Sequence, residues 1–139
     1  MTFTKSDFII KKSTIPNAGK GLFTKKQIAK GTEILEYTGK VTSWEDADHQ
    51  NGQNLYIFYV NKNHVVDASV KGNNLARYAN DADGLTKVKG LKNNSVYEIR
   101  KKRIMLIATK TIPEGGEILV EYGKDYWKTI KDHIKEGVL

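Results

Sequence analysis

The chain has 139 residues, of which 39% are hydrophobic and 28% are charged. This length and composition predict a single soluble domain over residues 1–139 and exclude a disordered chain. The net charge of +7 makes an acidic partner such as nucleic acid possible, but the lysines are spread along the chain and form no single block.

Cysteine is absent, which excludes disulfides and zinc–thiolate clusters, and the three histidines lie far apart in the sequence. We therefore expect no metal. The longest apolar runs, such as residues 104–108, are too short to cross a bilayer, and charges interrupt the apolar residues of the N-terminal segment. We expect an intracellular protein, in the cytoplasm, in the nucleus or in a host cell, with no membrane partner.

Seven short segments have the β-branched and aromatic residues, and the flanking turn residues, that are typical of strands. They are residues 8–12, 33–41, 55–60, 64–68, 96–100, 103–109 and 117–122. Asn61-Lys62-Asn63 separates two of them and predicts a tight hairpin turn. The sequence therefore predicts a mainly β fold.

Helical signals are fewer. Ser43, followed three residues later by Asp46, fits a capping box and predicts a short helix, and residues 71–78 fit another. After Gly123, apolar residues recur at helical spacing and predict a C-terminal amphipathic helix. Residues 81–94 are polar and rich in Gly and Lys, which predicts a mobile surface loop.

Four segments stand out, although each is weak evidence alone. In Gly19-Lys20-Gly21, glycines without a Cβ let the backbone turn and approach a ligand closely, yet the segment is neither a P-loop nor a dinucleotide fingerprint. Residues 36–39 read Glu-Tyr-Thr-Gly, and residues 66–81 run from Val-Asp-Ala to Ala-Arg-Tyr-Ala-Asn-Asp. Residues 112–123 read Ile-Pro-Glu-Gly-Gly-Glu-Ile-Leu-Val-Glu-Tyr-Gly.

In this order and spacing, the four segments resemble the SET family of protein lysine methyltransferases. The family pattern has a Gly-x-Gly, a Tyr-x-Gly, an Asp-Ala stretch that ends in Asn-His, and a closing Gly-Glu-Glu-Leu-Thr-x-x-Tyr-Gly. The resemblance covers residues 8–127 and is closest to the minimal viral and bacterial SET proteins. It implies small curved sheets, a pseudoknot in which the C-terminal segment passes under a loop, and a short C-terminal helix.

The resemblance also implies a cofactor and roles for individual residues. The cofactor is S-adenosyl-L-methionine, used as a co-substrate, and no metal takes part. Tyr122 is the implied catalytic tyrosine, while Tyr37 and Tyr97 line the channel for the substrate lysine. The implied cofactor-binding residues are Lys20, Gly21, Leu22, Arg77, Asn80, Asp81, Tyr122 and Trp127.

Some of these assignments have ordinary structural alternatives. Arg77 could equally form a surface ion pair, and Trp127, at the start of an amphipathic helix, could belong to the core. Asp81 departs from the family because it stands where the family has His. The acidic residues 43–48 fit either a helix cap or a surface that receives the basic residues of a substrate.

An aromatic channel suits the expected reaction, because a free lysine has a pKa of about 10.4 and is charged at neutral pH. Apolar walls and a nearby sulfonium lower that pKa and yield the nucleophilic amine. We therefore expect methyl transfer to the lysine side chain of a protein substrate, a histone or another basic protein.

One alternative is a catalytically inactive SET-like module that binds peptide or nucleic acid, which Asp81 favours. Retention of Asn80, Tyr37 and Tyr122 favours the enzyme. A plain nucleic-acid-binding barrel ranks last, because no strand combines exposed aromatic residues with basic ones, and the basic residues 100–103 fit a solvated turn. Nucleic acid is thus a possible partner but not a required one.

Overall fold

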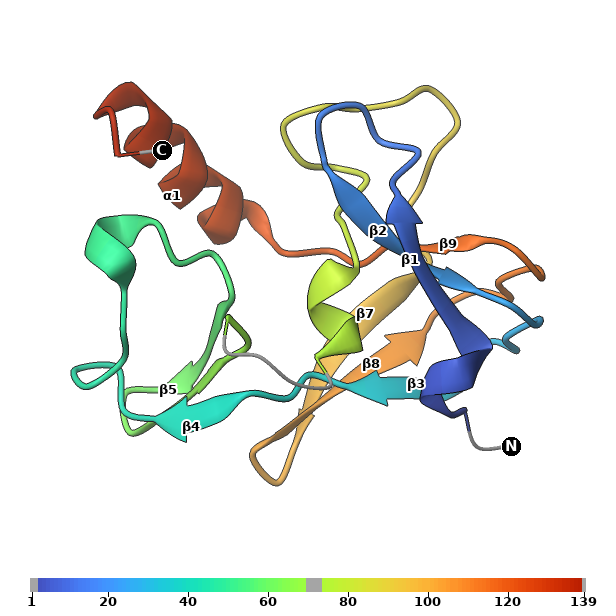
Figure 1. The fold of residues 1–139 in the computed structure, drawn as a ribbon, viewed down its shortest axis with the longest axis horizontal. Helices are drawn as coiled ribbons and strands as arrows, with labels where there is room; N and C mark the ends of the chain where they lie inside the picture. Colours follow the sequence, from blue (N-terminus) through green and yellow to red (C-terminus); the bar gives the residue numbers. More distant parts are fainter. Residues whose placement is uncertain (1–2, 70–73, 139) are drawn as a thin grey trace. The chain divides into compact units, whose positions relative to one another are not determined.

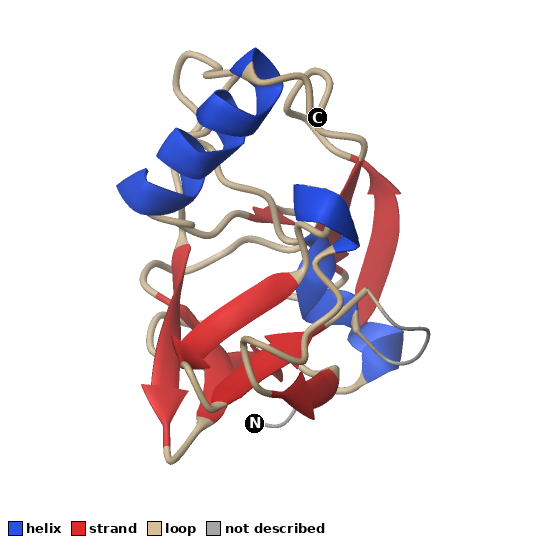
Figure 2. Cartoon of the chain, turned by 90° about the vertical axis from the view of Figure 1, so that its left-hand side faces the viewer, coloured by secondary structure: helices blue, strands red, loops and turns tan. Residues whose placement is uncertain are grey.

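A computed structural model of the chain describes residues 3–69 and 74–138. Short strands and turns dominate, and one longer helix lies near the C-terminus (Figures 1 and 2). The strands are β1 Phe8–Lys12, β2 Lys20–Thr24, β3 Glu33–Glu36, β4 Lys40–Thr42, β5 Ile57–Asn61, β6 His64–Asp67, β7 Ser95–Arg100, β8 Arg103–Ala108 and β9 Glu117–Ile118. The helices are three 3-10 turns, η1 Lys5–Asp7, η2 Gln50–Gly52 and η3 Leu75–Tyr78, and the α-helix α1 Lys124–Lys135.

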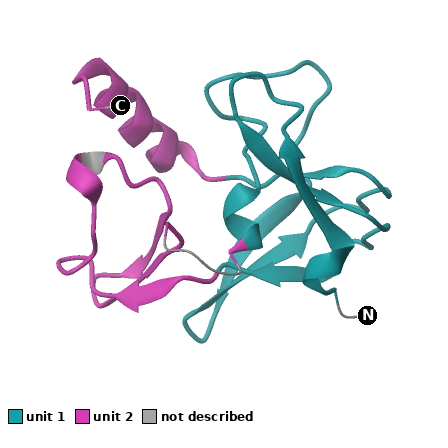
Figure 3. Cartoon of the chain, in the orientation of Figure 1, with its two compact units in different colours: residues 1–37, 75–121 teal, residues 38–74, 122–139 magenta. Residues whose placement is uncertain are grey.

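The chain divides into two compact units (Figure 3). The first comprises Met1–Tyr37 and Leu75–Glu121, and the second comprises Thr38–Asn74 and Tyr122–Leu139. The single domain predicted over residues 1–139 stays a prediction. No helix in the described residues is both long and apolar enough to span a membrane.

The first unit holds two three-stranded antiparallel sheets, with strand orders β1-β2-β9 and β3-β8-β7. Strand β8 is central in its sheet, and most of its side chains are buried, which accounts for its nearly continuous apolar sequence. The largest fully buried apolar side chains of this unit are Leu22, Ile28, Ile104, Leu106, Ile112, Ile118, Leu119 and Val120.

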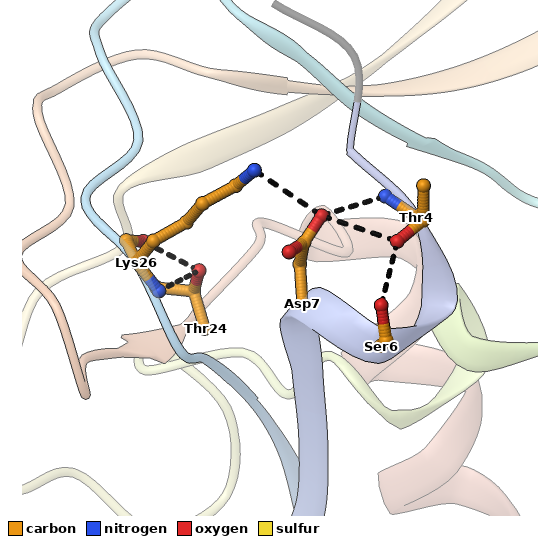
Figure 4. Close-up of polar contacts among 5 residues, drawn as sticks. All are labelled: Thr4, Ser6, Asp7, Thr24 and Lys26. Atoms are coloured by element: carbon orange, nitrogen blue, oxygen red, sulfur yellow. Dashed lines mark hydrogen bonds and ion pairs between the residues drawn. The ribbon is translucent and has the colours of Figure 1, made fainter.

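Polar contacts fasten the start of β1 to the end of β2 (Figure 4). The Oδ2 of Asp7 accepts a hydrogen bond from the Thr4 backbone N–H at 2.8 Å and pairs with Lys26 Nζ at 3.4 Å. The hydrogen bond from Thr4 and the nearby Lys26 ammonium lower the pKa of Asp7. The Thr24 hydroxyl donates to the Lys26 carbonyl at 2.6 Å and closes the turn after β2.

The second unit holds the sheet β4-β6-β5 and helix α1. Strands β5 and β6 form the hairpin predicted at residues 61–63, because Asn61 pairs with His64 and leaves a two-residue turn. The predicted C-terminal helix is also confirmed. It buries Ile130 but leaves Ile134 47% exposed, so only part of its apolar stripe packs.

Within the first unit, the segment that follows β9 runs between the two ends of the loop 81–94. Leu119 forms a parallel β-bridge with Asn80, and Val120 forms one with Ser95. Asn80 and Ser95 flank the loop, so the C-terminal segment crosses it as the implied pseudoknot requires. The mainly β fold class with a short C-terminal helix is therefore confirmed.

The structure corrects several predicted elements. Residues 33–41 form not one strand but β3 and β4, which belong to different sheets. Lys20 and Gly21 of the Gly19-Lys20-Gly21 segment, which was predicted to turn, belong to strand β2, which was not predicted. The last strand is limited to residues 117–118. Residues 75–78 of the predicted second helix form η3, whereas 71–73 lie outside the described residues.

The helix predicted at residue 43 is a single turn. Its cap is present, because Ser43 Oγ accepts from the Asp46 N–H at 3.1 Å, and one helical hydrogen bond joins Ala47 N to the Ser43 carbonyl at 3.0 Å. Four of the following residues, Asp48, His49, Asn51 and Gly52, have low helix propensity, and Gln50 and Asn51 adopt positive φ angles. The helical turn therefore ends at Ala47, one turn after Ser43.

Candidate active site

The Gly-x-Gly segment lies at the start of β2, where it closes the hairpin with β1. Gly19 adopts a φ of +71°, a conformation that favours glycine. Asn80 contacts this edge directly, because its Nδ2 donates a hydrogen bond to the Lys20 carbonyl at 3.0 Å. Leu22 is fully buried beneath it. Four residues assigned to cofactor binding, Lys20, Gly21, Leu22 and Asn80, are thus brought together.

Asp81 is oriented toward its own loop. Its side chain is buried, and its Oδ1 accepts hydrogen bonds from the Asp83 N–H and from Asn93 Nδ2, both at 2.8 Å. Asn93 Oδ1 in turn accepts from the Ala82 N–H at 2.8 Å. The base of loop 81–94 is therefore packed and hydrogen-bonded, while its predicted mobility and the cofactor role of Asp81 stay predictions.

The two predicted channel tyrosines touch each other. The rings of Tyr37, directly after β3, and Tyr97, on β7, lie 5.7 Å apart between centroids and meet at 86°. Tyr37 is 7% exposed, and its backbone N–H donates to the Ile104 carbonyl at 2.8 Å. The Tyr97 hydroxyl donates to the Ala76 carbonyl at 3.4 Å. Edge-to-face rings of this kind form a stable apolar wall.

Tyr122 belongs to the second unit, where it packs among aromatic residues of α1. Its ring stacks on Trp127 at 16° and 5.7 Å and meets Tyr126 at 72° and 4.8 Å. Gly123, with a φ of +97°, lets the chain turn between Tyr122 and the helix. Trp127 is half-buried and packs against Tyr122, so its placement in the core is not confirmed, and its contact with the cofactor stays a prediction.

Arg77 lies on η3 and folds over its neighbour. Its Nη2 donates to the Tyr78 hydroxyl at 2.7 Å, and its guanidinium lies 4.8 Å from the centroid of the same ring. This contact holds the guanidinium close to η3. Its predicted contact with the cofactor stays a prediction.

The family model of the SET domain matches residues 19–123, which include the four motif segments. The chain belongs to the SET domain family. Its relatives include histone-lysine N-methyltransferase 2D of Homo sapiens, which is 29% identical over 118 residues, or 78% of this chain and 2% of that protein. Histone-lysine N-methyltransferase trr of Drosophila melanogaster is 32% identical over 117 residues, 77% of this chain and 4% of that protein.

Other relatives agree with this assignment. N-lysine methyltransferase KMT5A-A of Danio rerio is 28% identical over 130 residues, 86% of this chain and 36% of that protein. Among solved structures, one similar fold is a humanized mutant of the Chaetomium thermophilum Polycomb Repressive Complex 2 bound to an inhibitor. Its TM-score is 0.70 and the sequences are 27% identical, and the match covers 89% of this chain and 16% of that chain. The match with this chain thus covers only 2 to 36% of the length of these relatives.

Two residues that sequence reasoning did not assign hold this SET domain together. Asn94 Nδ2 donates to the Glu117 carbonyl and Asn94 Oδ1 accepts from the Leu119 N–H, each at 2.9 Å, so Asn94 ties the loop's end to the crossing segment. Glu117 is a buried carboxylate in the Gly-Gly-Glu-Ile stretch. Its partners lie more than 100 residues away in the sequence, so no local pattern identifies them.

The basic residues 100–103 of the SET domain form the tip of the β7–β8 hairpin. Arg100 pairs with Glu33 and Glu98, and Arg103 pairs with Glu36. The hydrogen bonds to these glutamates raise the pKa of both arginines. Neighbouring carboxylates therefore offset two of the four charges, as in a solvated turn. Nucleic-acid binding stays a prediction.

Across residues 3–69 and 74–138 of the SET domain, no group of three or more His, Cys, Asp or Glu side chains is arranged to hold a metal ion. The three histidines are His49, His64 and His133, and His49 Nε2 is engaged with the Trp44 carbonyl at 2.7 Å.

Proposed function

We propose that this SET domain transfers a methyl group from S-adenosyl-L-methionine to the side-chain amine of a lysine in a protein substrate. The observation that carries the proposal is the contact of the Asn80 amide with the Lys20 carbonyl at the edge of the Gly-x-Gly segment. Membership of the SET domain family supports it, as does the similarity to histone-lysine and N-lysine methyltransferases.

The edge around Lys20 fits an amino-acid-like ligand. Apart from its two chain neighbours, no described residue has a heavy atom within 4 Å of the position that a Cβ on Gly19 would occupy, so the backbone there is open to approach. Asn80 uses Nδ2 on Lys20, which leaves its Oδ1 without a hydrogen bond among the described residues and available to an ammonium group. When bound, the cofactor supplies an electrophilic methyl group on a cationic sulfonium.

The chain's own residues have three tasks in this proposal. The walls formed by Tyr37 and Tyr97 exclude water and favour the neutral amine of the substrate lysine. The amine nitrogen forms a bond to the methyl carbon while the carbon–sulfur bond breaks, and the amine releases a proton. The Tyr122 hydroxyl orients the amine, and alignment of the reacting atoms is worth about 7–11 kcal/mol at its limit.

Calorimetry with S-adenosyl-L-methionine in the presence of a chelator tests the first step. We expect binding by the wild type and weaker binding by Asn80→Ala, while Asn63→Ala, at an exposed position in the turn between β5 and β6, serves as the matched control. No heat at millimolar cofactor would contradict the proposal. Cofactor and peptide binding without any transfer of label would instead identify a catalytically inactive SET-like module.

A further inference from the structure

Glu117 is a buried carboxylate whose two oxygens both bind one turn of the chain. Its side chain belongs to β9 and is 8% exposed. Oε2 accepts a hydrogen bond from Ser13 Oγ at 2.6 Å. Oε1 accepts from the Thr14 N–H at 3.0 Å and from Thr14 Oγ1 at 2.5 Å. Three donors from two adjacent residues therefore satisfy a charge that would otherwise be costly to bury.

The turn held by Glu117 is the one that leads into the Gly-x-Gly segment. Ser13 Oγ also accepts from the Ile15 N–H at 3.1 Å, and the Ser13 N–H donates to the Gly19 carbonyl at 2.8 Å. Ile15 then packs with Ala82 and Leu119 in a small buried cluster. The carboxylate thus fixes the start of residues 13–19, the connection between β1 and β2, and the backbone hydrogen bond from Ser13 to Gly19 closes the other end.

Glu117 also explains why residue 21 is glycine. A Cβ on Gly21 would overlap the Oε2 and Cδ of Glu117 and lie 3.2 Å from the Ser13 Cβ. The φ of Gly21 is not positive, so the requirement for glycine comes from the carboxylate and not from the backbone conformation. The far end of a glutamate can usually move aside, but three hydrogen bonds hold this one in place.

We propose that Glu117 is a positioning residue that fixes the backbone edge formed by Lys20, Gly21 and Leu22 for cofactor binding. The inference rests on the proposed function of that edge. Asn80 holds the edge at the Lys20 carbonyl, and Glu117 holds it through Ser13 and Thr14. An edge that is ordered before the ligand arrives binds more tightly, because less conformational freedom is lost on binding.

The test measures the dissociation constant of S-adenosyl-L-methionine by calorimetry for Glu117→Gln and Thr14→Val. Glu117→Gln keeps the size of the side chain and removes its charge. Thr14→Val removes the hydroxyl that donates to Glu117, and because Thr14 is exposed, this substitution leaves the core intact. We expect Glu117→Gln to weaken binding by at least about tenfold, which corresponds to about 1.4 kcal/mol. In turnover, the KM for the cofactor rises while kcat at saturating cofactor stays within about twofold.

Ile28→Val is the control for a purely structural effect. Ile28 is fully buried in the same unit, and its backbone hydrogen bonds go to Ile112 and not to the 13–19 turn. The substitution lowers stability by about 0.5–1.5 kcal/mol. If Ile28→Val weakens cofactor binding as much as Glu117→Gln at an equal loss of thermal stability, Glu117 is not a positioning residue.

The Gly21→Ala and Glu117→Ala variants, alone and combined, test the link between the two residues. Because the new methyl displaces the carboxylate, we expect the double variant to bind the cofactor no more weakly than the weaker single variant. Additive losses, or binding by Glu117→Gln within about twofold of wild type, would overturn the inference. Wild-type protein that binds no cofactor would remove the proposed function itself, which is a separate outcome.

Discussion

Replacement of Gly39 by alanine should be among the most destabilising single substitutions in the second unit. A Cβ on Gly39 would overlap the carbonyl group of Asp67 and lie 2.8 Å from the backbone nitrogen of Ala68. These are backbone atoms, so no change of rotamer relieves the overlap. Strand β4 must move away from β6, with which it pairs at Lys40 and Asp67.

The structure also sets the size of the effect. The backbone after Asp67 is held by its own side chain, whose Oδ1 accepts from the Ser69 N–H at 2.9 Å and from Ser69 Oγ at 2.6 Å. Overpacking against rigid groups costs about 1–3 kcal/mol. Loss of a hydrogen bond to a charged group adds about 1.5–3 kcal/mol. We therefore expect Gly39→Ala to lose about 3 kcal/mol or more, which is a decrease in Tm of about 10 °C for a chain of this size.

Urea and thermal unfolding, followed by circular dichroism, measure this loss, and Gly19→Ala is the matched control. Gly19 has a positive φ but open space around the new methyl, so its substitution costs only the backbone strain of about 1–2 kcal/mol. A loss below about 1 kcal/mol in Gly39→Ala, or one smaller than in Gly19→Ala, would refute the steric argument.

Four further predictions concern the reaction, its substrate and the pH dependence of stability. Tyr122→Phe removes one hydroxyl, so we expect kcat to fall at least about a hundredfold with little change in cofactor affinity, measured by steady-state kinetics and calorimetry. Burial alone would raise the pKa of Asp67, but hydrogen bonds from Ser69 and Asn54 outweigh it and lower that pKa. The ionised Asp67 carboxylate therefore stabilises the fold fully above its unfolded pKa of about 3.9, and this stabilisation is lost as the pH falls through the lower folded pKa. We expect Asp67→Asn to cost more stability at about pH 7 than at about pH 3. The only charged residues between Lys40 and Lys62 are acidic, so the double substitution of Glu45 by Gln and Asp48 by Asn should raise the KM of a basic peptide at low salt. Tyr97→Phe should shift the product from mainly monomethyllysine toward di- and trimethyllysine, measured by intact mass, because the hydroxyl occupies room that a second methyl needs.

Opposite results would remove these roles one at a time. Turnover by Tyr122→Phe within about threefold of wild type would show that its hydroxyl takes no part in the reaction. An equal stability loss at both pH values would mean that Asp67 acts without its charge. An unchanged peptide KM at low salt would leave the acidic residues only the turn capped by Ser43. Mainly trimethylated product from wild type would place Tyr97 away from the amine.

Local features of the fold were predictable from the sequence because their causes are local. The Asn61-Lys62-Asn63 turn follows from the residues themselves, and Asn63 N–H indeed donates to Asn61 Oδ1 at 2.9 Å. The C-terminal helix follows from the spacing of its apolar residues. The division of residues 33–41 between two sheets could not be predicted, because it depends on contacts with Ile104 and Asp67, far along the chain.

The same distinction applies to the candidate site. The resemblance assigned Tyr37, Tyr97 and Asn80, and the structure brings Tyr37 against Tyr97 and Asn80 against Lys20. Glu117 forms hydrogen bonds with residues that lie 103 and 104 positions away in the sequence. A single sequence does not distinguish a buried glutamate from one on the surface. Only the folded chain reveals the contacts of Glu117.

The most direct test of the proposed reaction locates the methyl group that the protein transfers. Wild type and Tyr122→Phe are incubated with methyl-labelled S-adenosyl-L-methionine and histones, and the products are digested and sequenced by mass spectrometry. We expect label on lysine side chains with wild type and nearly none with Tyr122→Phe. Wild-type protein that binds the cofactor but labels no lysine in histones or in a whole-cell lysate would contradict it.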